Sequence, residues 1–501
     1  MLSKSKRILF GMLHGIMLLV MVHWFLISVT YLREISWLAI LGAGLLFLLG
    51  WLKRDGVKRA LAWLTQHKKG FLLGAIVFQL IVMVCAELLI RRDAAVVFKG
   101  AFELLKQSSI TNYLSRNPNN IPLFLYEKFF YVLFGSSGLW VMQVLNMLYV
   151  NLGAVLLYKL SQKHFNQKTA DLVYLFYVSL ICYSPYFYSM YTDIPPLPLI
   201  ALQLWWSLDL LKENQAGISW KKMFGLGILS GVTMLIRPTT IIVMIAFWAV
   251  LFFRGNWKVF GKIATVTVMT TGFVFAGLNT AVNHQRVVPI LKEEGLAKGP
   301  LLFINLGLTD MGHNQEDMKE GLLAYIDEDK RSDYNNGLFK KENVIKEIKR
   351  RLKEYGPLGL IGHIYYKQSL TVAEGTLGWL YRDVKYEKTP FINPLYATLT
   401  KDNGFAKWVR TYFLSTDRPQ YKYYEFIKQL IWIVLSAGLL GAYLKRRDTD
   451  DFNFLSLAVF GGLLFLTIFE GGKTRYLIQF LPQILLVASI GLAGYPKKEN
   501  T

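Results

Sequence analysis

Apolar stretches of membrane-spanning length recur along most of this chain, and they constrain its fold more than any other feature. A helix needs about 20 apolar residues to cross the hydrocarbon core of a bilayer. Twelve stretches approach that length, and a few are short. They lie at residues 8–30, 35–52, 71–90, 139–160, 168–185, 195–212, 222–236, 239–253, 260–281, 426–444, 454–470 and 476–494. The sequence therefore predicts an all-α polytopic membrane protein with about twelve spans.

Composition supports this fold class. Hydrophobic residues make up 53% of the 501 residues and charged residues 18%, whereas soluble proteins have about 25% charged residues. Disordered, collagen-like and soluble nucleic-acid-binding proteins are excluded, and no nucleic-acid partner is expected. Cys85 and Cys182 both lie in apolar stretches, which favours packing roles over a disulfide or a metal pair.

The distribution of basic residues predicts the topology. The chain has 56 Lys and Arg against 34 Asp and Glu, a net charge of +22, and cytoplasmic loops carry the excess of Lys and Arg. Short basic loops alternate with weakly charged ones. They contain Lys53 to Lys69, Lys163 and Lys168, Lys221 and Lys222, Arg254 to Lys262, Lys445 to Arg447, and Lys497 and Lys498. We therefore expect a multi-pass protein of the cytoplasmic membrane with both termini inside.

One apolar segment, Ile121–Gly135, is too short for a confident span and is interrupted by Glu127 and Lys128. If it crossed the membrane, several Lys-rich turns would move outside. We therefore expect an interfacial helix. The resulting domains are residues 1–70 (two spans and a cytoplasmic loop), 71–282 (a membrane core with an outer loop at 91–137), 283–425 (a large, mainly helical extracellular loop) and 426–501 (the last spans).

The large loop contains a basic amphipathic stretch, Phe339–Tyr355, with apolar residues at helical spacing. It rests on lipid headgroups or on the membrane domain, or it is a solvated surface helix. The sequence leaves these alternatives open.

Two acids lie at the predicted outer ends of spans, where ionisable groups often mark a site. Asp93 follows the third span in Arg91-Arg92-Asp93. It is either a base that takes a proton from a hydroxyl or an acid that neutralises its arginine neighbours. Asp193, in the turn before Pro195, is a functional acid, a helix N-cap, or both.

Cations lie at the same predicted face. Arg237, between two spans, either extends to lipid headgroups or offers a fork of donors to a phosphate. The last outer turn, Glu470-Gly471-Gly472-Lys473-Thr474-Arg475, combines one acid and two cations with glycines that permit close backbone approach. It is either a phosphate site or an ordinary charged turn. The shared depth of these groups predicts a single site facing the outside.

Sequence motifs of soluble enzymes are absent. We find no phosphate-binding P-loop, no GxGxxG after a strand and no HExxH. The seven histidines are scattered, so a histidine-based metal site is not expected, and His313 and His363 are predicted to be surface or packing residues.

The order of several short motifs resembles the GT-C glycosyltransferases, in the branch of protein O-mannosyltransferases and bacterial aminoarabinose transferases. The similarity covers most of the chain from about Phe71 onward. Its motifs are Asp93 after an early span, Asn117-Pro118-Asn119-Asn120, Leu133-Phe134-Gly135, Tyr191-Thr192-Asp193, Arg237-Pro238, and Glu470 with Arg475-Tyr476. In the large loop, Met311-Gly312-His313-Asn314 and Glu374 to Trp379 resemble segments of Gram-positive members. The chain departs from the family pattern in having two spans, rather than one, before the first outer loop and a single acid there.

This resemblance implies a GT-C-like helical bundle that transfers a sugar from a polyprenyl-phosphate carrier to an acceptor outside the membrane, with inversion at the anomeric carbon. Membrane lipids and an extracellular glycan, lipid or protein acceptor are the implied partners. Asp93 would be the base and Asp193 would orient hydroxyls. The implied substrate- and phosphate-binding residues are Arg92, Asn119, Arg237, Glu470, Lys473 and Arg475. The sequence predicts no specific cofactor; it leaves a divalent cation open, but no ligand pattern supports one.

Two other classes share this composition. A transporter or lipid flippase would show internal repeats and helices broken at matching positions of two halves, and we see no such symmetry. A membrane scaffold that binds a partner through its large loop would leave the outer acids unexplained.

Overall fold

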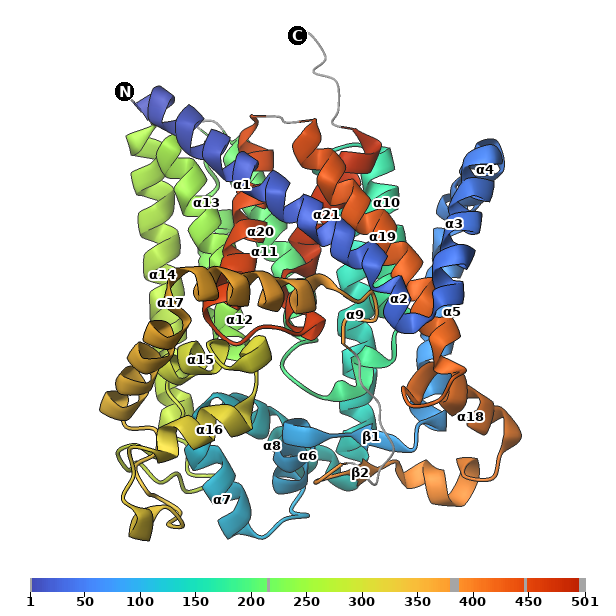
Figure 1. Ribbon diagram of the computed structural model, residues 1–501. Helices are drawn as coiled ribbons and strands as arrows, with labels where there is room; N and C mark the ends of the chain where they lie inside the picture. The colour runs from blue at the N-terminus through green and yellow to red at the C-terminus, as the bar shows by residue number, and fades with distance from the viewer. Residues whose placement is uncertain (1, 214–216, 379–386, 446–447, 495–501) are drawn as a thin grey trace.

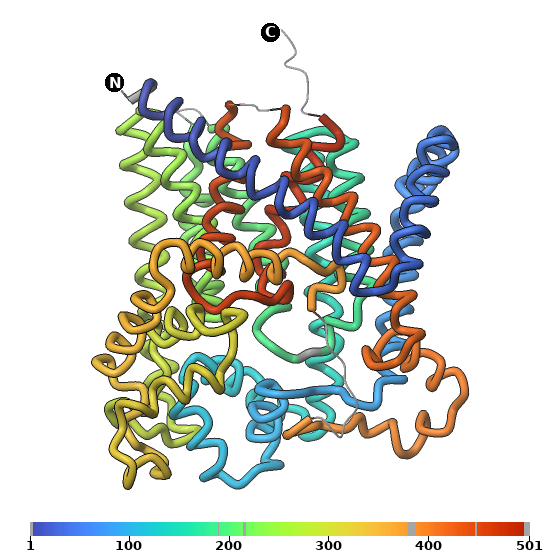
Figure 2. Tube along the Cα trace, in the orientation of Figure 1, coloured from blue at the N-terminus to red at the C-terminus, as the bar shows by residue number. Residues whose placement is uncertain are grey.

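The protein is an all-α polytopic membrane protein. The computed structural model describes residues 2–213, 217–378, 387–445 and 448–494. Long helices form a bundle, and shorter helices form an outer layer across one end of it (Figure 1). The first turn of α1 and the last turn of α21 both lie at the opposite end (Figure 2). Both chain ends thus lie on one side of the bundle, as a protein with N-in and C-in topology requires.

Each of the twelve predicted apolar segments contains a helix. These are α1 (Leu2–Thr30), α3 (Trp37–Leu52), α5 (Lys68–Cys85), α9 (Gly138–His164), α10 (Gln167–Tyr177), α11 (Pro196–Lys212), α12 (Trp220–Ile236), α13 (Ile241–Phe253), α14 (Trp257–Asn283), α19 (Tyr421–Leu444), α20 (Asp450–Ile468) and α21 (Leu481–Ala493). Within the described residues, seven helical segments are long and apolar enough to cross a membrane, or eight if α3 and the helix after it, bent by 91°, form one span. Because α13 has only 13 residues and α11 and α12 have 17 each, the number of twelve spans stays a prediction.

The remaining elements connect or cover the bundle. The connecting helices are α2 (Leu32–Ile35) and α4 (Arg54–Gln66). The outer layer contains α6 (Arg92–Ala101), α7 (Gln107–Arg116), α8 (Ile121–Phe134), α15 (Pro300–Gly307), α16 (Gln315–Leu323), α17 (Lys341–Val372) and α18 (Gly404–Val409), with the strands β1 (Leu88–Ile90) and β2 (Phe391–Ile392). Trp379, Arg446, Arg447, Lys497 and Lys498, which the sequence analysis names, lie outside the described residues.

The segment predicted to be interfacial forms α8 and lies in the outer layer (Figure 1). Gly135 adopts a positive φ of 55° after it. The chain turns so sharply there that a Cβ on Gly138 would lie 2.7 Å from the carbonyl oxygen of Phe130. Helix α8 is thus separate from α9, and its exposed Phe129 and Val132 give it an apolar face.

The first span, which belongs to the predicted N-terminal region of residues 1–70, packs on the last spans of the chain. Helix α1 crosses the bundle obliquely (Figure 1) and packs against α19. The fully buried rings of Trp24 and Trp432 lie 5.6 Å apart at this contact. Helices α3 and α4, in contrast, stand at the edge of the molecule (Figure 1).

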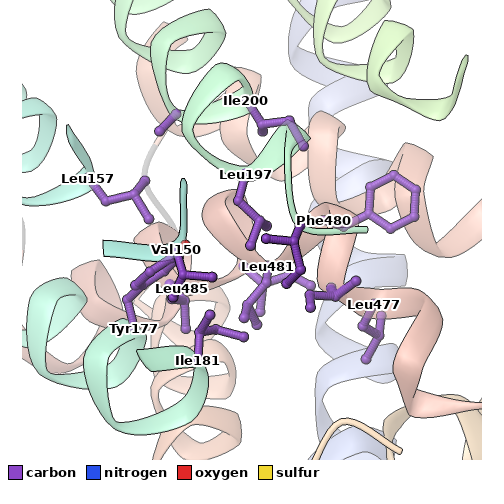
Figure 3. Packing of buried hydrophobic residues seen from close by; sticks show 14 of the residues in the cluster. Val150, Leu157, Tyr177, Ile181, Leu197, Ile200, Leu477, Phe480, Leu481 and Leu485 are labelled. Atoms are coloured by element: carbon purple, nitrogen blue, oxygen red, sulfur yellow. The ribbon is translucent and has the colours of Figure 1, made fainter. Parts of the chain in front are cut away.

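The bundle core lies where α9, α10, α11 and α21 meet. Val150, Tyr177, Leu197 and Leu481 interdigitate there and are fully buried (Figure 3). Helix α10 changes to a π-helix at η3 (Val178–Cys182), and the Nζ atom of Lys428 donates to backbone carbonyls there, at 2.9 Å from Tyr183 O. The lysine supplies donors to carbonyls that lipid cannot satisfy.

Ion pairs join helix ends at the end of the bundle away from the outer layer. Asp209 of α11 pairs with Lys163 of α9 at 2.6 Å and with Lys222 of α12 at 3.1 Å. Asp450 of α20 pairs with Lys6 at 2.7 Å and with Arg254 at 2.8 Å. These cations come from the basic segments predicted to be cytoplasmic, so those segments gather at one end of the molecule.

A two-stranded antiparallel sheet joins the two outer loops, since β1 pairs with β2. The side chain of Asn393, just after β2, donates to the carbonyls of Met83 and Ala86 at 2.9 Å each. The sheet therefore fixes the segment that leads directly from β1 into Asp93.

Candidate functional site

The predicted charged residues converge at the outer end of the bundle, at the ends of four elements. Asp93 lies in the first turn of α6, and Asp193 lies in the connection between η4 (Pro185–Ser189) and α11. Arg237 ends α12, and Arg475 lies in η12 (Thr474–Phe480) just before α21. These elements are distant in sequence, so only the folded bundle brings the four residues together.

Asp193 is the centre of a buried charge cluster, with a side chain only 2% exposed. One carboxylate oxygen lies 3.1 Å from Arg237 Nη2, and the other lies 3.1 Å from Arg475 Nη2. The Tyr186 hydroxyl also donates to Asp193, at 3.0 Å. Burial raises the pKa of Asp193, but the two arginines outweigh burial and hold the pKa below its ordinary value. Asp193 is therefore an ionised partner for two cations.

The two arginines differ in how many of their N–H donors are already bonded to the protein. Arg237 also donates from Nε to Gln479 Oε1 and from Nη1 to Thr192 Oγ1, both at 3.0 Å, and its side chain is 18% exposed. Among the described residues, Arg475 bonds only to Asp193; it lies over the ring of Tyr191 at 5.4 Å and is 33% exposed. Arg475 is thus the better placed of the two to reach a ligand.

Asp93 is exposed and lies close enough to Tyr113 for its charge to act on that hydroxyl: burial, followed by the charge of Asp93, raises the pKa of Tyr113. Asn120 Nδ2 donates to the Tyr113 oxygen at 2.9 Å, and Tyr191 OH donates to Asn120 Oδ1 at 3.4 Å. This chain of hydrogen bonds runs from Tyr113, on which the charge of Asp93 acts, to Tyr191, whose ring lies beneath Arg475, so it connects the surroundings of the base candidate with those of the charge cluster.

The side chains of two lysines at this site make no hydrogen bond or ion pair with any described residue. Lys473 precedes η12, and burial followed by the charge of Arg92 lowers its pKa to about 8. Lys298 is also half-buried; burial lowers its pKa, against the charges of Asp93 and Glu470. Both ammonium groups are therefore available to a ligand in a partly dehydrated setting.

The turn that carries Glu470 and Lys473 is clamped by the large loop. His313 Nδ1 bonds to the carbonyls of Met311 and Gly471, at 3.1 and 3.2 Å. Lys367, buried in α17, donates to Phe469 O at 2.6 Å. Glu470 accepts a short hydrogen bond from Tyr476. The segment Met311 to Asn314 thus holds this turn in place. The sequence predicts only a surface or packing role for His313, and the structure adds these hydrogen bonds.

Not every predicted residue joins this network. Asn119 is exposed and makes no hydrogen bond to a described residue; the neighbouring Asn120 is buried and makes the contacts. Arg92 is exposed, with a φ of 53°, and its backbone N–H donates to Glu387 at 2.9 Å. Its charge nevertheless acts on Lys473.

Sequence reasoning missed Lys298, Tyr113 and Tyr186, and it named Tyr191 only as part of the motif around Asp193. Lys298 stands between Gly295 and Gly299-Pro300 in a loop without periodicity, and only those turn residues could have drawn attention to it. Among the described residues, no group of three or more His, Cys, Asp or Glu side chains is arranged to hold a metal ion.

Comparison with known proteins gives a family and one distant structural neighbour. A search of curated proteins gives no match. Among solved structures, the crystal structure of ArnT from Cupriavidus metallidurans in the apo state is 13% identical, over 86% of this chain and 78% of that one, with a TM-score of 0.32. A family described as "conserved hypothetical integral membrane protein" matches residues 7–494. The chain therefore belongs to this family of integral membrane proteins.

Proposed function

We propose that this protein is a membrane glycosyltransferase that moves a sugar from a polyprenyl-phosphate carrier to an acceptor on the outer face of the cytoplasmic membrane. One observation carries the proposal: an exposed carboxylate, Asp93, shares a site with Lys298 and Lys473, whose side chains have no other described partner. A base and uncommitted cations are what displacement of a phosphate by a hydroxyl requires. The order of GT-C-like motifs along the chain also supports it.

The cations suit the donor's phosphate. Lys473, Lys298 and the exposed part of Arg475 offer charge-assisted hydrogen bonds, which are stronger than neutral ones. Negative charge grows on the phosphate as its bond to the sugar breaks. Donors fixed around that phosphate before the reaction stabilise the transition state more than the ground state.

The proposed reaction is a single displacement at the anomeric carbon. The acceptor oxygen forms a bond to that carbon while Asp93 takes the hydroxyl proton. The bond to the phosphate oxygen breaks, and the polyprenyl phosphate leaves with the electron pair. Attack opposite the leaving group inverts the anomeric configuration.

Asp193 has a different role in this mechanism. Both its oxygens are occupied, by Arg237 on one side and by Arg475 and Tyr186 on the other. It is a positioning residue that holds Arg475 at the phosphate, and it is not available to take a proton.

Asp93→Asn tests the proposal. Asparagine keeps the size of the side chain but cannot accept the proton, so we expect transfer to fall by about 10²- to 10⁴-fold with donor binding retained. The assay uses membrane vesicles that contain the protein and natural acceptors, supplied with a panel of synthetic polyprenyl-phosphate sugars. The readouts are sugar covalently joined to an acceptor and donor affinity of the purified protein.

Asp333→Asn, at an exposed acid elsewhere in the large loop, is the matched control and should transfer normally. Transfer by Asp93→Asn at the control rate would remove Asp93 as the base. If the wild-type protein moved lipid-linked sugars across the bilayer without joining them to an acceptor, the protein would be a flippase.

A further inference from the structure

Helix α17 consists of two halves that differ in orientation and in surface. Gly356 interrupts it with a φ of 56°, and Pro357 follows. Proline lacks a backbone N–H and disfavours the helical conformation in the residue before it, so the axis bends there. The half before the bend lies in the outer layer, whereas the half after it runs across the bundle axis (Figure 1). We refer to residues 357–372 as the cross helix.

The first half of α17 is the basic stretch whose surroundings the sequence left open, and it packs on protein. Val344 is buried in a small core with Met318 and Leu322 of α16. Arg351 pairs with Asp317 of α16 at 2.9 Å. The first half of α17 thus packs against the outer layer.

The cross helix has an apolar face that the described residues leave largely uncovered. Leu358, Ile361 and Tyr365 are 84%, 63% and 59% exposed. Their spacing of three and four residues places them on one side of the helix. A soluble surface rarely carries three large apolar residues this exposed side by side, and such patches mark contact with protein or membrane.

The opposite face is bonded to the site. His363 Nε2 lies 2.9 Å from Gly307 O, and Lys367 donates to Gly307, Thr467 and Phe469, at 2.6 to 3.0 Å. Phe469 directly precedes Glu470. The cross helix and the turn of residues 470–476 therefore form one rigid unit.

The contact with α1 indicates the depth of the cross helix in the bilayer. The rings of Tyr365 and His23 lie 4.3 Å apart, and His23 Nε2 lies 3.1 Å from Ser369 Oγ. His23 is seven residues from Thr30, the last residue of α1, which is about 10 Å along a helix. Helix α1 is a candidate membrane span, and its neighbouring Leu19 and Leu26 are exposed as lipid-facing residues are. The contact thus falls near the outer boundary of the hydrocarbon core.

We propose that the cross helix lies flat in the outer leaflet, with Leu358, Ile361 and Tyr365 against phospholipid acyl chains, and that it sets the height of the 470–476 turn at the lipid headgroups. Amphipathic interfacial helices insert about 5–10 Å into this boundary, which matches the depth of the contact with α1. The uncovered face is continuous with the lipid-facing side of α1, so lipid is the occupant. This inference does not depend on any reaction at the site.

Nitroxide labels at Leu358→Cys and Ile361→Cys test the proposal in phosphatidylcholine–phosphatidylglycerol liposomes. Cys85 and Cys182 are buried and are first replaced by alanine. Power saturation then compares collisions with oxygen, which concentrates in lipid, and with a nickel chelate, which stays in water. We expect oxygen to dominate at both positions. The matched controls are Lys349→Cys and Lys353→Cys, exposed in the first half of α17, where the nickel chelate should dominate.

Two outcomes would overturn the proposal. If the nickel chelate dominates at 358 and 361 as well, the face is in water. If both reagents collide rarely there, a protein partner or a second copy covers the face. All four positions are exposed, so the labels leave the core undisturbed, and gel filtration checks the fold of each variant.

Discussion

Asp193 and Asp93 are both carboxylates at the outer end of the bundle, yet their surroundings give them opposite properties. Asp193 is buried between Arg237 and Arg475, whereas Asp93 is exposed and pairs with no arginine in the described residues. Breaking a buried ion pair by removing one partner costs about 3–5 kcal/mol, because a charge is left buried without compensation. Surface groups cost far less. Replacement by asparagine should therefore lower the stability of the protein at Asp193 and lower the rate of sugar transfer at Asp93.

We predict that Asp193→Asn lowers the thermal stability of the purified protein, by an amount within this range of about 3–5 kcal/mol. Thermal unfolding in detergent, followed by fluorescence-detected gel filtration, measures the effect. Asp93→Asn should unfold like the wild type. A double variant, Asp193→Asn with Arg237→Gln, should recover part of the loss, because one of the unpaired charges is gone. Equal melting of Asp193→Asn and the wild type would show that the cluster contributes nothing to stability.

Donor affinity should depend on pH through Lys473. Its ammonium binds phosphate only when protonated, and its pKa in the unliganded protein is about 8. Affinity should be constant below pH 8 and fall by up to tenfold per pH unit above it, since a proton must be taken up on binding. Lys473→Arg, which stays charged, should flatten the profile. Isothermal titration with a polyprenyl-phosphate sugar between pH 6.5 and 9.5 measures it, and an unchanged slope in the arginine variant would exclude Lys473 as the titrating group.

At the scale of elements, the site depends on how loops pack onto helix ends. The 470–476 turn has little structure of its own; Lys367 holds it on one side and His313 on the other. Gly472 adopts a φ of 71° and closely faces the carbonyl of Met311. A glycine is needed at this position because any Cβ would collide with that carbonyl.

Gly472→Ala should therefore displace the turn from the segment Met311 to Asn314. We expect donor binding to weaken by about 10-fold or more, because Lys473 and Arg475 move with the turn and a charge-assisted contact is worth about 1.5–3 kcal/mol. Gly272→Ala is the matched control: it lies within α14 and a Cβ there meets nothing within 4 Å. If both alanine variants bind the donor like the wild type, the turn tolerates the displacement and its geometry is not critical.

At the scale of the whole molecule, the topology is open to direct measurement. Lys58→Cys lies on α4 in the predicted cytoplasmic loop, and Asp333→Cys lies in the predicted outer loop; both positions are exposed. In intact cells, a membrane-impermeant thiol reagent should label position 333 and leave position 58 unlabelled until the membrane is opened. The reverse pattern would invert the protein and place the site in the cytoplasm.

The bundle was predictable from sequence because lipid offers the backbone no hydrogen-bond partner, so a long apolar segment must be a helix. Ends of helices were predictable as well, which is why Asp193 and Arg237 could be assigned to one face. Loop packing was not. Lys298 reaches the site because its backbone N–H donates to Arg116 O, at 3.0 Å. A loop contact of this kind does not produce a periodic residue pattern, so the sequence does not predict it. The network through Tyr113 and Asn120 likewise depends on turns whose geometry follows from tertiary packing.

The charge pairs at the two ends of the bundle have a mechanical consequence. Helices α11 and α12 are joined at one end by Asp209 and Lys222 and at the other by Asp193 and Arg237. The two acids are 16 residues apart, or about 24 Å along a helix. Sliding of one helix past the other by a single turn would break both pairs at once and strand buried charge at each end. The ion pairs at both ends therefore hold α11 and α12 in a fixed register. Movement near the site is therefore expected in the loops that pack on this pair of helices rather than as sliding between α11 and α12.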